Sequence, residues 1–467
     1  MILGPLLVLC LMILASVRPV MRVQAPVPHL LIVCSGIFIC GLTAWIIAFH
    51  TARKLRALPA MRMQSMKQYQ QLQRLHSALI VVILGTITFV TKWPHIIRIN
   101  WMLNDTVLLD ELGLLAPFLI ASLVSWLAFY EVDHVLEKQG LVRTGSLSST
   151  RGQHLLFQLR HHSALIFVPA LLLITIFELL LLFSPSAVQQ SSFLVAITLT
   201  FLCSPLLLIT IWKTKPLTES QLREKFKIIC HRSRVPIRDI LVWETQDKIV
   251  NALVTGFLSR LRFVLMSDRL LSQFGTSELE YIFAHEIAHI KHHHLLLRVL
   301  GLLPLGAILL VIDHDSAGNF SGFQTLPEWS TWCITMFITL LYIFSVFAYY
   351  SRRLERQADL YACRMLSCRN FTCTEAEHSV LNNHSVPKHC CPTSIYRFVQ
   401  LLRQLEDSCQ ASHSIFAWQH FRLPQRIAFL ESLLDEPETS HDSDQALSRL
   451  TGLFALVSLV AIVVLMF

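Results

Sequence analysis

Two histidines and a glutamate in the run His285-Glu286-Ile-Ala-His289 have the spacing of a metal site. On a helix, His285 and His289 project from one face because they lie one turn apart, and two imidazoles on that face can hold a zinc ion. Glu286 stands beside the first histidine, where its carboxylate can act as a general base on water that attacks a carbonyl. This combination indicates zinc-dependent hydrolysis of peptide bonds.

A third protein ligand is expected, because a catalytic zinc site takes three and keeps its fourth position for water or substrate. The best candidate is Glu355, in the run Ser351-Arg-Arg-Leu-Glu-Arg-Gln-Ala-Asp359. The sequence therefore predicts one zinc ion per chain, bound by His285, His289 and Glu355. Simpler explanations stay open: the histidine motif can arise by chance in a chain with 21 histidines, and Glu355 could pair with Arg352.

The histidine motif needs a helix of defined register. Ser277 and Glu280 match the S-x-x-E capping box, which predicts that a helix begins there and continues through both histidines. The following His292, His293 and His294 invite a metal interpretation, but at the membrane edge of a cationic helix they are expected to be interfacial.

A small sheet, antiparallel or mixed, is predicted before this helix. Short runs rich in β-branched and aromatic residues occupy 240–243, 249–255 and 262–266. An amphipathic helix is predicted ahead of them, over 218–232.

The composition is that of a polytopic membrane protein. Of the 467 residues, 54% are hydrophobic and 15% are charged, and the mean hydropathy is +0.54. Apolar stretches of spanning length predict about nine spans. They lie at about 1–17, 29–49, 77–91, 113–130, 163–184, 192–212, 297–312, 332–350 and 450–467. The first is interpreted as a retained anchor, since no basic region precedes it.

These spans divide the chain around one soluble domain. Residues 1–212 are expected to form a membrane anchor of about six spans. Residues 213–296 and 351–446 are expected to form the zinc peptidase domain, interrupted by a transmembrane hairpin over 297–350. Residues 447–467 form the last predicted span.

The net charge of +8 is interpreted as an orientation signal and an attraction to anionic lipid. Lysines and arginines crowd the loops at 50–76 and 131–162, which places these loops and the histidine motif in the cytoplasm. A bacterial inner membrane is the expected location, with the endoplasmic reticulum as the alternative. No nucleic-acid motif is present, so no nucleic-acid partner is expected.

With these motifs in view, the sequence resembles the membrane-integral zinc metallopeptidases that include the HtpX heat-shock proteases and the CAAX prenyl endopeptidases. The resemblance covers about 215–430 and rests on four segments: His285–His289, Ser351–Asp359, Asn251-Ala-Leu-Val-Thr-Gly256, and His420 with Arg426-Ile427. It implies an α-helical multi-pass membrane protein with an α+β peptidase domain of the gluzincin type.

The resemblance also implies roles for single residues. Asp359 would orient a ligand histidine. Asn251 and Ala252 would pair with the substrate backbone, and His420 and Arg426 would help to hold the tetrahedral intermediate. Phe421 stands where the last motif often has proline. Alternatives stay open: Asp359 could pair with Arg356, Asn251 could cap a turn, and His420 could be a surface histidine.

Five cysteines and three histidines gather in one soluble stretch that looks like an insertion at 363–395. They are Cys363, Cys368, Cys373, Cys390 and Cys391, with His378, His384 and His389. A second metal site or a disulfide knot would explain them, but the spacing matches no standard zinc pair. Since the predicted cytoplasmic side keeps thiols reduced, incidental cysteines are the default interpretation.

Three functions are compatible with these features. The first is a membrane-embedded zinc endopeptidase that cleaves membrane or membrane-proximal proteins, in quality control or regulated proteolysis. The second is a CAAX prenyl-protein processing protease. The third is a receptor-like signalling protein whose zinc domain cleaves itself or binds partners. Glu286 argues against a binding module without turnover, because metal binding requires only the ligands. The oligomeric state stays open.

Overall fold

The computed structural model describes most of the chain. Its described residues are 23, 26–57, 62–103, 106–138, 150–183, 185–314, 328–368, 373–374, 386–387, 389–411, 423–435 and 439–466. Several residues named above lie outside these ranges: the predicted span 1–17, His378, His384, His420 and Phe421.

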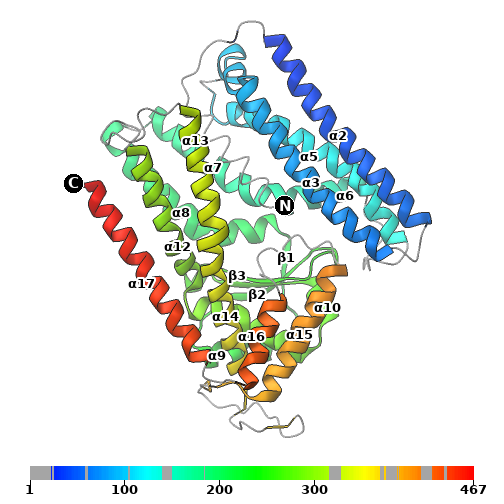
Figure 1. Cartoon of the computed structure of the whole chain (residues 1–467), viewed down its shortest axis with the longest axis vertical. Helices are drawn as coiled ribbons and strands as arrows, with labels where there is room; N and C mark the ends of the chain where they lie inside the picture. The colour runs from blue at the N-terminus through cyan, green and yellow to red at the C-terminus, as the bar shows by residue number, and fades with distance from the viewer. Residues whose placement is uncertain are drawn as a thin grey trace.

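Long helices form most of the structure, in two groups above a small sheet (Figure 1). One group consists of α2 (Pro26–Ala57), α3 (Arg62–Val90) and α5 (Leu109–Lys138), with the short α4 (Trp93–His95) and η2 (Ile96–Asn100) between α3 and α5. The chain then passes through α6 (Arg151–Gln158) and the π-helical η3 (Leu159–Ala164) into the pair α7 (Leu165–Phe183) and α8 (Ser186–Ile211).

The second half of the chain alternates between soluble and apolar helices. The soluble ones are α9 (Ser220–Ser233), α10 (Asp268–Gln273), α11 (Thr276–Lys291), α15 (Pro392–Ala411) and α16 (Leu423–Asp435). The apolar ones are α12 (His294–His314), α13 (Glu328–Leu341) and α17 (Thr439–Met466). The π-helical η6 (Tyr342–Phe347) continues α13 into α14 (Ala348–Met365), which reaches down into the soluble part (Figure 1).

The prediction of an integral, multi-pass membrane protein is confirmed, but the expected nine spans are not. Among the described residues, five helices are long and apolar enough to cross a membrane: Pro26–Ala57, Leu109–Lys138, Arg151–Phe183, Ser191–Ile211 and Ile334–Met365. A sixth is added if α11 and α12, bent by 54°, count as one span. The predicted span 77–91 is only the apolar end of α3, whose first half is rich in glutamine and basic residues. The last apolar helix, Gln445–Val460, is shorter.

The sheet is mixed, one of the two arrangements expected. Its order is β1 (Thr214–Pro216), β2 (Asp239–Trp243), β4 (Phe263–Ser267) and β3 (Ala252–Thr255). β2 and β4 are parallel, and the two outer strands are antiparallel to their neighbours. The predicted runs agree with β2 to β4 apart from their ends. β1 was not expected, because Thr-Lys-Pro carries no run of β-branched or aromatic residues.

Both faces of the sheet are buried, which explains why β2 and β4 are continuous apolar runs. Side chains alternate between the faces. Ile240 and Val264 pack in one core with the helices of the soluble part, whereas Trp243 and Leu265 pack in another with residues of α7 and α8. One face of the sheet is therefore covered by helices of the soluble part, and the other face is covered by α7 and α8 of the predicted membrane anchor.

An aromatic stack joins the anchor to the sheet. Trp212, at the end of α8, stacks on Trp243 with ring centroids 4.1 Å apart, and His161 of η3 stacks on both. The Trp243 indole Nε1 also donates a hydrogen bond to His161 Nε2 at 3.1 Å. These rings are buried, so the stack fixes the position of the sheet relative to the spans.

This stack predicts a large stability effect at one residue. Trp243→Ala removes a fully buried ring and leaves His161 without its donor, so we expect the free energy of unfolding to fall by about 3 to 5 kcal/mol. Denaturant titration of the detergent-solubilised protein would measure it. Trp45→Ala is the matched control, because Trp45 of α2 is 57% exposed. Equal losses in the two variants would contradict a structural role for the stack.

Candidate metal centre

Helix α11 supplies the histidine motif, but it does not begin where the sequence predicted. Its first residue is Thr276 and its N-cap is Gly275, which makes no side-chain capping bond. The expected capping box of Ser277 and Glu280 is therefore wrong. Glu280 instead lies 2.6 Å from Lys225 Nζ on α9, an ion pair between helices. The register survives because Leu279, Phe283 and Ile287 bury the same face in the core.

The three predicted ligand side chains meet at one point. His285 Nε2 lies 3.3 Å from His289 Nε2 and 3.4 Å from Glu355 Oε2. His289 Nε2 lies 3.8 Å from Glu355 Oε1. A tetrahedral zinc site with bonds of about 2.1 Å has ligand atoms about 3.4 Å apart. Two imidazoles and a carboxylate at this spacing fit zinc both in donor chemistry and in size.

Asp359, one turn after Glu355 on α14, supports the first histidine. Its Oδ1 lies 2.9 Å from His285 Nδ1, the ring nitrogen that faces away from Glu355. Holding this nitrogen fixes the ring orientation and leaves Nε2 for a metal. Asp359 does not pair with Arg356, whose guanidinium lies over the Phe429 ring.

Arg426 of α16 holds Asp359 from the opposite side. Its Nε and Nη2 donate to the two carboxylate oxygens at 2.7 and 2.5 Å. Burial works against the charge of the guanidinium, but attraction to Asp359 outweighs it, so the pKa of Arg426 is raised above its ordinary value. The sequence placed Arg426 at the tetrahedral intermediate, but its guanidinium neutralises the buried Asp359 carboxylate, and Arg426 is not among the residues that line the cavity described below.

His294 is a site residue that the sequence did not reveal, and its expected interfacial position is wrong. It is fully buried, its Nδ1 lies 2.7 Å from His289 Nδ1, and its Nε2 lies 2.9 Å from Gln357 Oε1. The reason is a turn: α11 ends at Lys291, His293 adopts a φ of 54°, and α12 begins at His294. This turn brings the ring back against the second ligand histidine. No periodicity in the sequence signals it.

Arg298 is a second such residue. Its Nη2 lies 2.7 Å from Glu355 Oε1, and the Glu355 side chain is almost completely buried. The ion pair orients the carboxylate toward the histidines. A signal was available, since an arginine at the start of the apolar run 297–312 is expensive in a membrane and usually has a function.

A cavity of about 940 Å³ opens beside these ligands. Glu286, His289 and Glu355 line it, together with residues of α8 and η6. The strand segment Ala252–Phe257 forms a further wall. Glu286, His289 and Glu355 therefore face a space large enough for a stretch of peptide, at the junction between the soluble domain and the spans.

The wall formed by β3 has the features of a strand-binding edge. β3 is an outer strand, and Ser267 N donates to Asn251 O at 3.0 Å just before it. Hydrogen-bonded pairs alternate along an antiparallel ladder, so Ala252 and Val254 turn their backbone groups away from β4. Asn251 itself is buried, and its backbone N–H donates to Ser267 Oγ at 3.1 Å.

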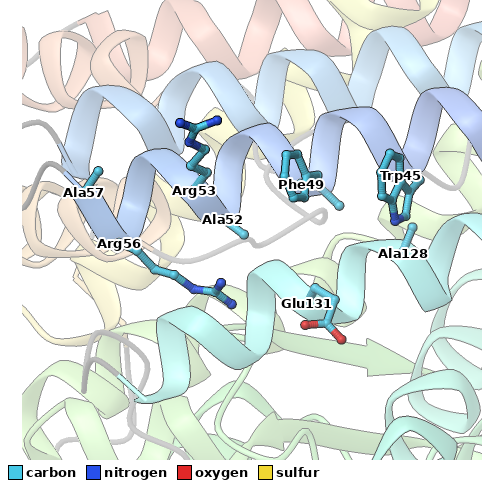
Figure 2. A pocket seen from close by; sticks show the side chains of 9 residues that line it. Trp45, Phe49, Ala52, Arg53, Arg56, Ala57, Ala128 and Glu131 are labelled. Atoms are coloured by element: carbon cyan, nitrogen blue, oxygen red, sulfur yellow. The ribbon is translucent and has the colours of Figure 1, made fainter.

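A second cavity, of about 500 Å³, lies between α2 and α5 (Figure 2). Its lining includes Trp45 and Phe49 together with Arg53, Arg56 and Glu131. None of the predicted ligand or catalytic residues contributes to it. It is therefore separate from the candidate metal centre.

The comparisons with known proteins point to one peptidase family. Residues 216–434 match the family model described as Peptidase family M48. A CAAX prenyl protease 1 homolog of Arabidopsis thaliana is 27% identical over 122 residues, 25% of this chain and 29% of that protein. A protease HtpX homolog of Thermococcus sibiricus is 27% identical over 126 residues, 26% of this chain and 42% of that protein.

The matched segments therefore span less than half the length of these curated relatives. Among solved structures, the crystal structure of S. mikatae Ste24p is similar with a TM-score of 0.49 at 15% identity. That likeness covers 86% of this chain and 99% of the other.

The distances between the ligand atoms generate a prediction about metal content. His285→Ala, His289→Ala and Glu355→Ala each remove one of three donors, so each should lower the zinc bound per chain, measured by elemental analysis of purified protein. Asp359→Asn keeps all donors and should weaken zinc affinity by about 10- to 100-fold. Glu278→Ala, in the first turn of α11, is the matched control. Full zinc occupancy in Glu355→Ala would place the third ligand elsewhere.

Proposed function

We propose that this chain, whose residues 216–434 belong to peptidase family M48, is a membrane-embedded zinc-dependent endopeptidase that cleaves membrane or membrane-proximal proteins. The observation that carries the proposal is the triangle of His285, His289 and Glu355 donor atoms, with edges of 3.3 to 3.8 Å, at the wall of a peptide-sized cavity. One zinc ion per chain fits this triangle.

The residues around the triangle have distinct tasks. Zinc, when bound, supplies a Lewis acid that polarises the carbonyl and lowers the pKa of water. Glu286 lines the cavity beside the ligands, and its carboxylate takes a proton from the attacking water and passes it to the leaving amine. Asp359 keeps the His285 ring in place, and Arg426 keeps Asp359 in place. His420, outside the described residues, stays the proposed donor to the tetrahedral intermediate.

The substrate binds as an added strand. A peptide laid along β3 exchanges hydrogen bonds with the backbone of Ala252 and Val254, which gives affinity with little side-chain selectivity. Such pairing demands an extended segment. Because the cavity is walled partly by α8 and η6, segments next to a membrane span reach it most easily.

The finer organisation is also part of the proposal. We place the soluble domain, a gluzincin-type α+β unit formed by 213–296 and 351–446, on the cytoplasmic side, as the distribution of basic residues indicates. A bacterial inner membrane or the endoplasmic reticulum provides that geometry. The chain enters the bilayer about nine times if the apolar segments outside the five long spans also insert.

Removal of the general base tests the function directly. Glu286→Gln keeps the three ligand side chains, so we expect zinc content to stay unchanged and turnover to fall by about 10²- to 10⁴-fold. The assay would follow cleavage of a flexible segment next to a membrane span, in detergent or liposomes. Glu278→Gln, on the same helix, is the control. Near-normal turnover in Glu286→Gln would refute the mechanism.

A proline in β3 tests the strand-pairing step. Val254→Pro deletes an N–H that points away from β4, so the sheet should persist while KM rises at least several-fold, because one backbone bond to substrate is lost. Leu253→Pro deletes an N–H that pairs with β4, and it should lower stability instead. Unchanged KM in a folded Val254→Pro protein would show that the substrate does not pair there.

Processing of prenylated proteins is the second candidate function. The cavity favours it, since Leu165, Phe201 and Phe344 extend an apolar wall from the ligands toward the spans, and a CAAX prenyl protease homolog is among the relatives. A thioether-linked isoprenoid on the test peptide decides between the two. A strict requirement for the lipid would favour processing, whereas equal cleavage without it would favour the general endopeptidase.

A further inference from the structure

Three cysteines converge at a place that the proposed catalytic function does not use. The sulfur atoms of Cys368, Cys373 and Cys391 all lie within 4.8 Å of one another. Cys368 and Cys373 follow the end of α14, and Cys391 directly precedes α15. Cys373 and Cys391 are buried, with exposed fractions of 6% and 2%, whereas Cys368 is half-buried.

Polar contacts with Thr393 and Ser367 hold this cluster in place. Cys373 Sγ lies 3.2 Å from Thr393 Oγ1, and the Thr393 hydroxyl donates to the Cys373 carbonyl at 3.0 Å. The backbone N–H of Cys391 donates to Ser367 Oγ at 3.0 Å. Outer hydrogen bonds that fix a ligand and its backbone are the usual surroundings of protein metal sites.

The other two cysteines of the segment point to different partners. Cys363 Sγ lies 3.5 Å from Ser394 Oγ, and Cys390 Sγ lies 3.9 Å from the Leu360 carbonyl. The fold thus selects three of five neighbouring thiols and brings them together. A disulfide would use only two of the three, whereas a metal ion uses all of them.

The size and chemistry of the cluster suit a thiophilic metal. Thiolates select zinc and copper(I) over harder cations. Zinc–sulfur bonds of about 2.3 Å place sulfurs about 3.8 Å apart in a tetrahedron, which is inside the spacing observed.

We propose that Cys368, Cys373 and Cys391 bind a second, structural zinc ion through their thiolates. On binding, the three thiols release their protons to solvent. The ion joins the chain after α14 to the start of α15, and so braces the helix that carries Glu355 and Asp359. Incidental cysteines were the default expectation. Sequence spacing did not reveal the site, because Cys391 lies 18 residues after Cys373 in the sequence and comes close to it only through the packing of α15.

Metal counting on variants that lack the catalytic ligands tests the proposal without any cleavage assay. The intact protein, purified with zinc and a non-thiol reductant, should hold two zinc ions per chain. The double variant His285→Ala/Glu355→Ala keeps all cysteines and should hold one. No zinc in that variant would overturn the proposal, whatever becomes of the proposed peptidase activity.

Cobalt(II) substitution identifies the ligands of the remaining ion. In the same double variant, cobalt should give the near-ultraviolet absorption of thiolate-to-metal charge transfer. Adding Cys368→Ser, the least buried of the three positions and the gentlest change to the fold, should weaken that absorption strongly. Cys230→Ser on α9 is the matched control and should leave it unchanged. Absence of the absorption, or its persistence in the Cys368→Ser protein, would overturn the site.

A disulfide between two of the cysteines is the competing explanation. Mass spectrometry of the intact protein, alkylated without reductant, tests for it. Under the proposal all three thiols are alkylated after the metal has been chelated. A disulfide between any two of Cys368, Cys373 and Cys391 in the freshly isolated protein would overturn the metal site in favour of a redox bridge.

Discussion

The buried ion pair between Asp359 and Arg426 is the interaction on which the geometry of the proposed metal centre depends. Asp359 is fully buried and contacts the ligand His285, so its charge would be costly without a partner. Arg426 supplies that partner from α16, a helix far away in the sequence. Because Glu355 lies one turn before Asp359, the pair also sets how α14 faces α11. A single arginine side chain on α16 thereby helps to fix the positions of the proposed ligands on two other helices.

The sheet connects the helices of the proposed metal centre to the membrane spans. Its helix-facing side belongs to the core that contains α11 and α14, and its other side packs on the anchor through Trp212, Trp243 and His161. A rigid sheet between the two layers leaves the cavity at their boundary, with β3 as one wall. The proposed reaction site is thus positioned by two cores, and loosening either core would displace β3 relative to His285, His289 and Glu355.

Sequence reasoning located the parts of the site that depend on regular helical spacing. His285 and His289, and Glu355 with Asp359, each lie four residues apart, and the structure brings all four side chains together. The site residues that sequence reasoning missed depend on irregular backbone or on packing between segments distant in the sequence. His294 reaches His289 only because the chain turns at His293. The helix start at Thr276 could not be predicted from Ser277, since burial of Leu279 and Phe283 fixes the register without a side-chain cap.

The sequence likewise predicted the regular parts of the fold better than the parts that depend on distant packing. The apolar runs that became long helices were identified, but among the described residues only five or six of the nine predicted spans are long and apolar enough to cross a membrane, because a run such as 77–91 continues a polar helix. The three strongest strands were found from composition. β1 was missed, since its place in the sheet comes from pairing with β2 and not from its own residues.

The open edge of β3 has a consequence for how copies of this protein coexist in a crowded bilayer. A bare strand edge invites pairing with any other strand, which is a common route to self-association and aggregation. Here the edge lies inside a recess whose other walls are spans and the ligand helices. A single extended chain needs less room in that recess than the edge of another folded sheet, which brings its neighbouring strands with it. The recess therefore disfavours pairing between copies of this protein, while the same backbone groups stay open to a single extended chain.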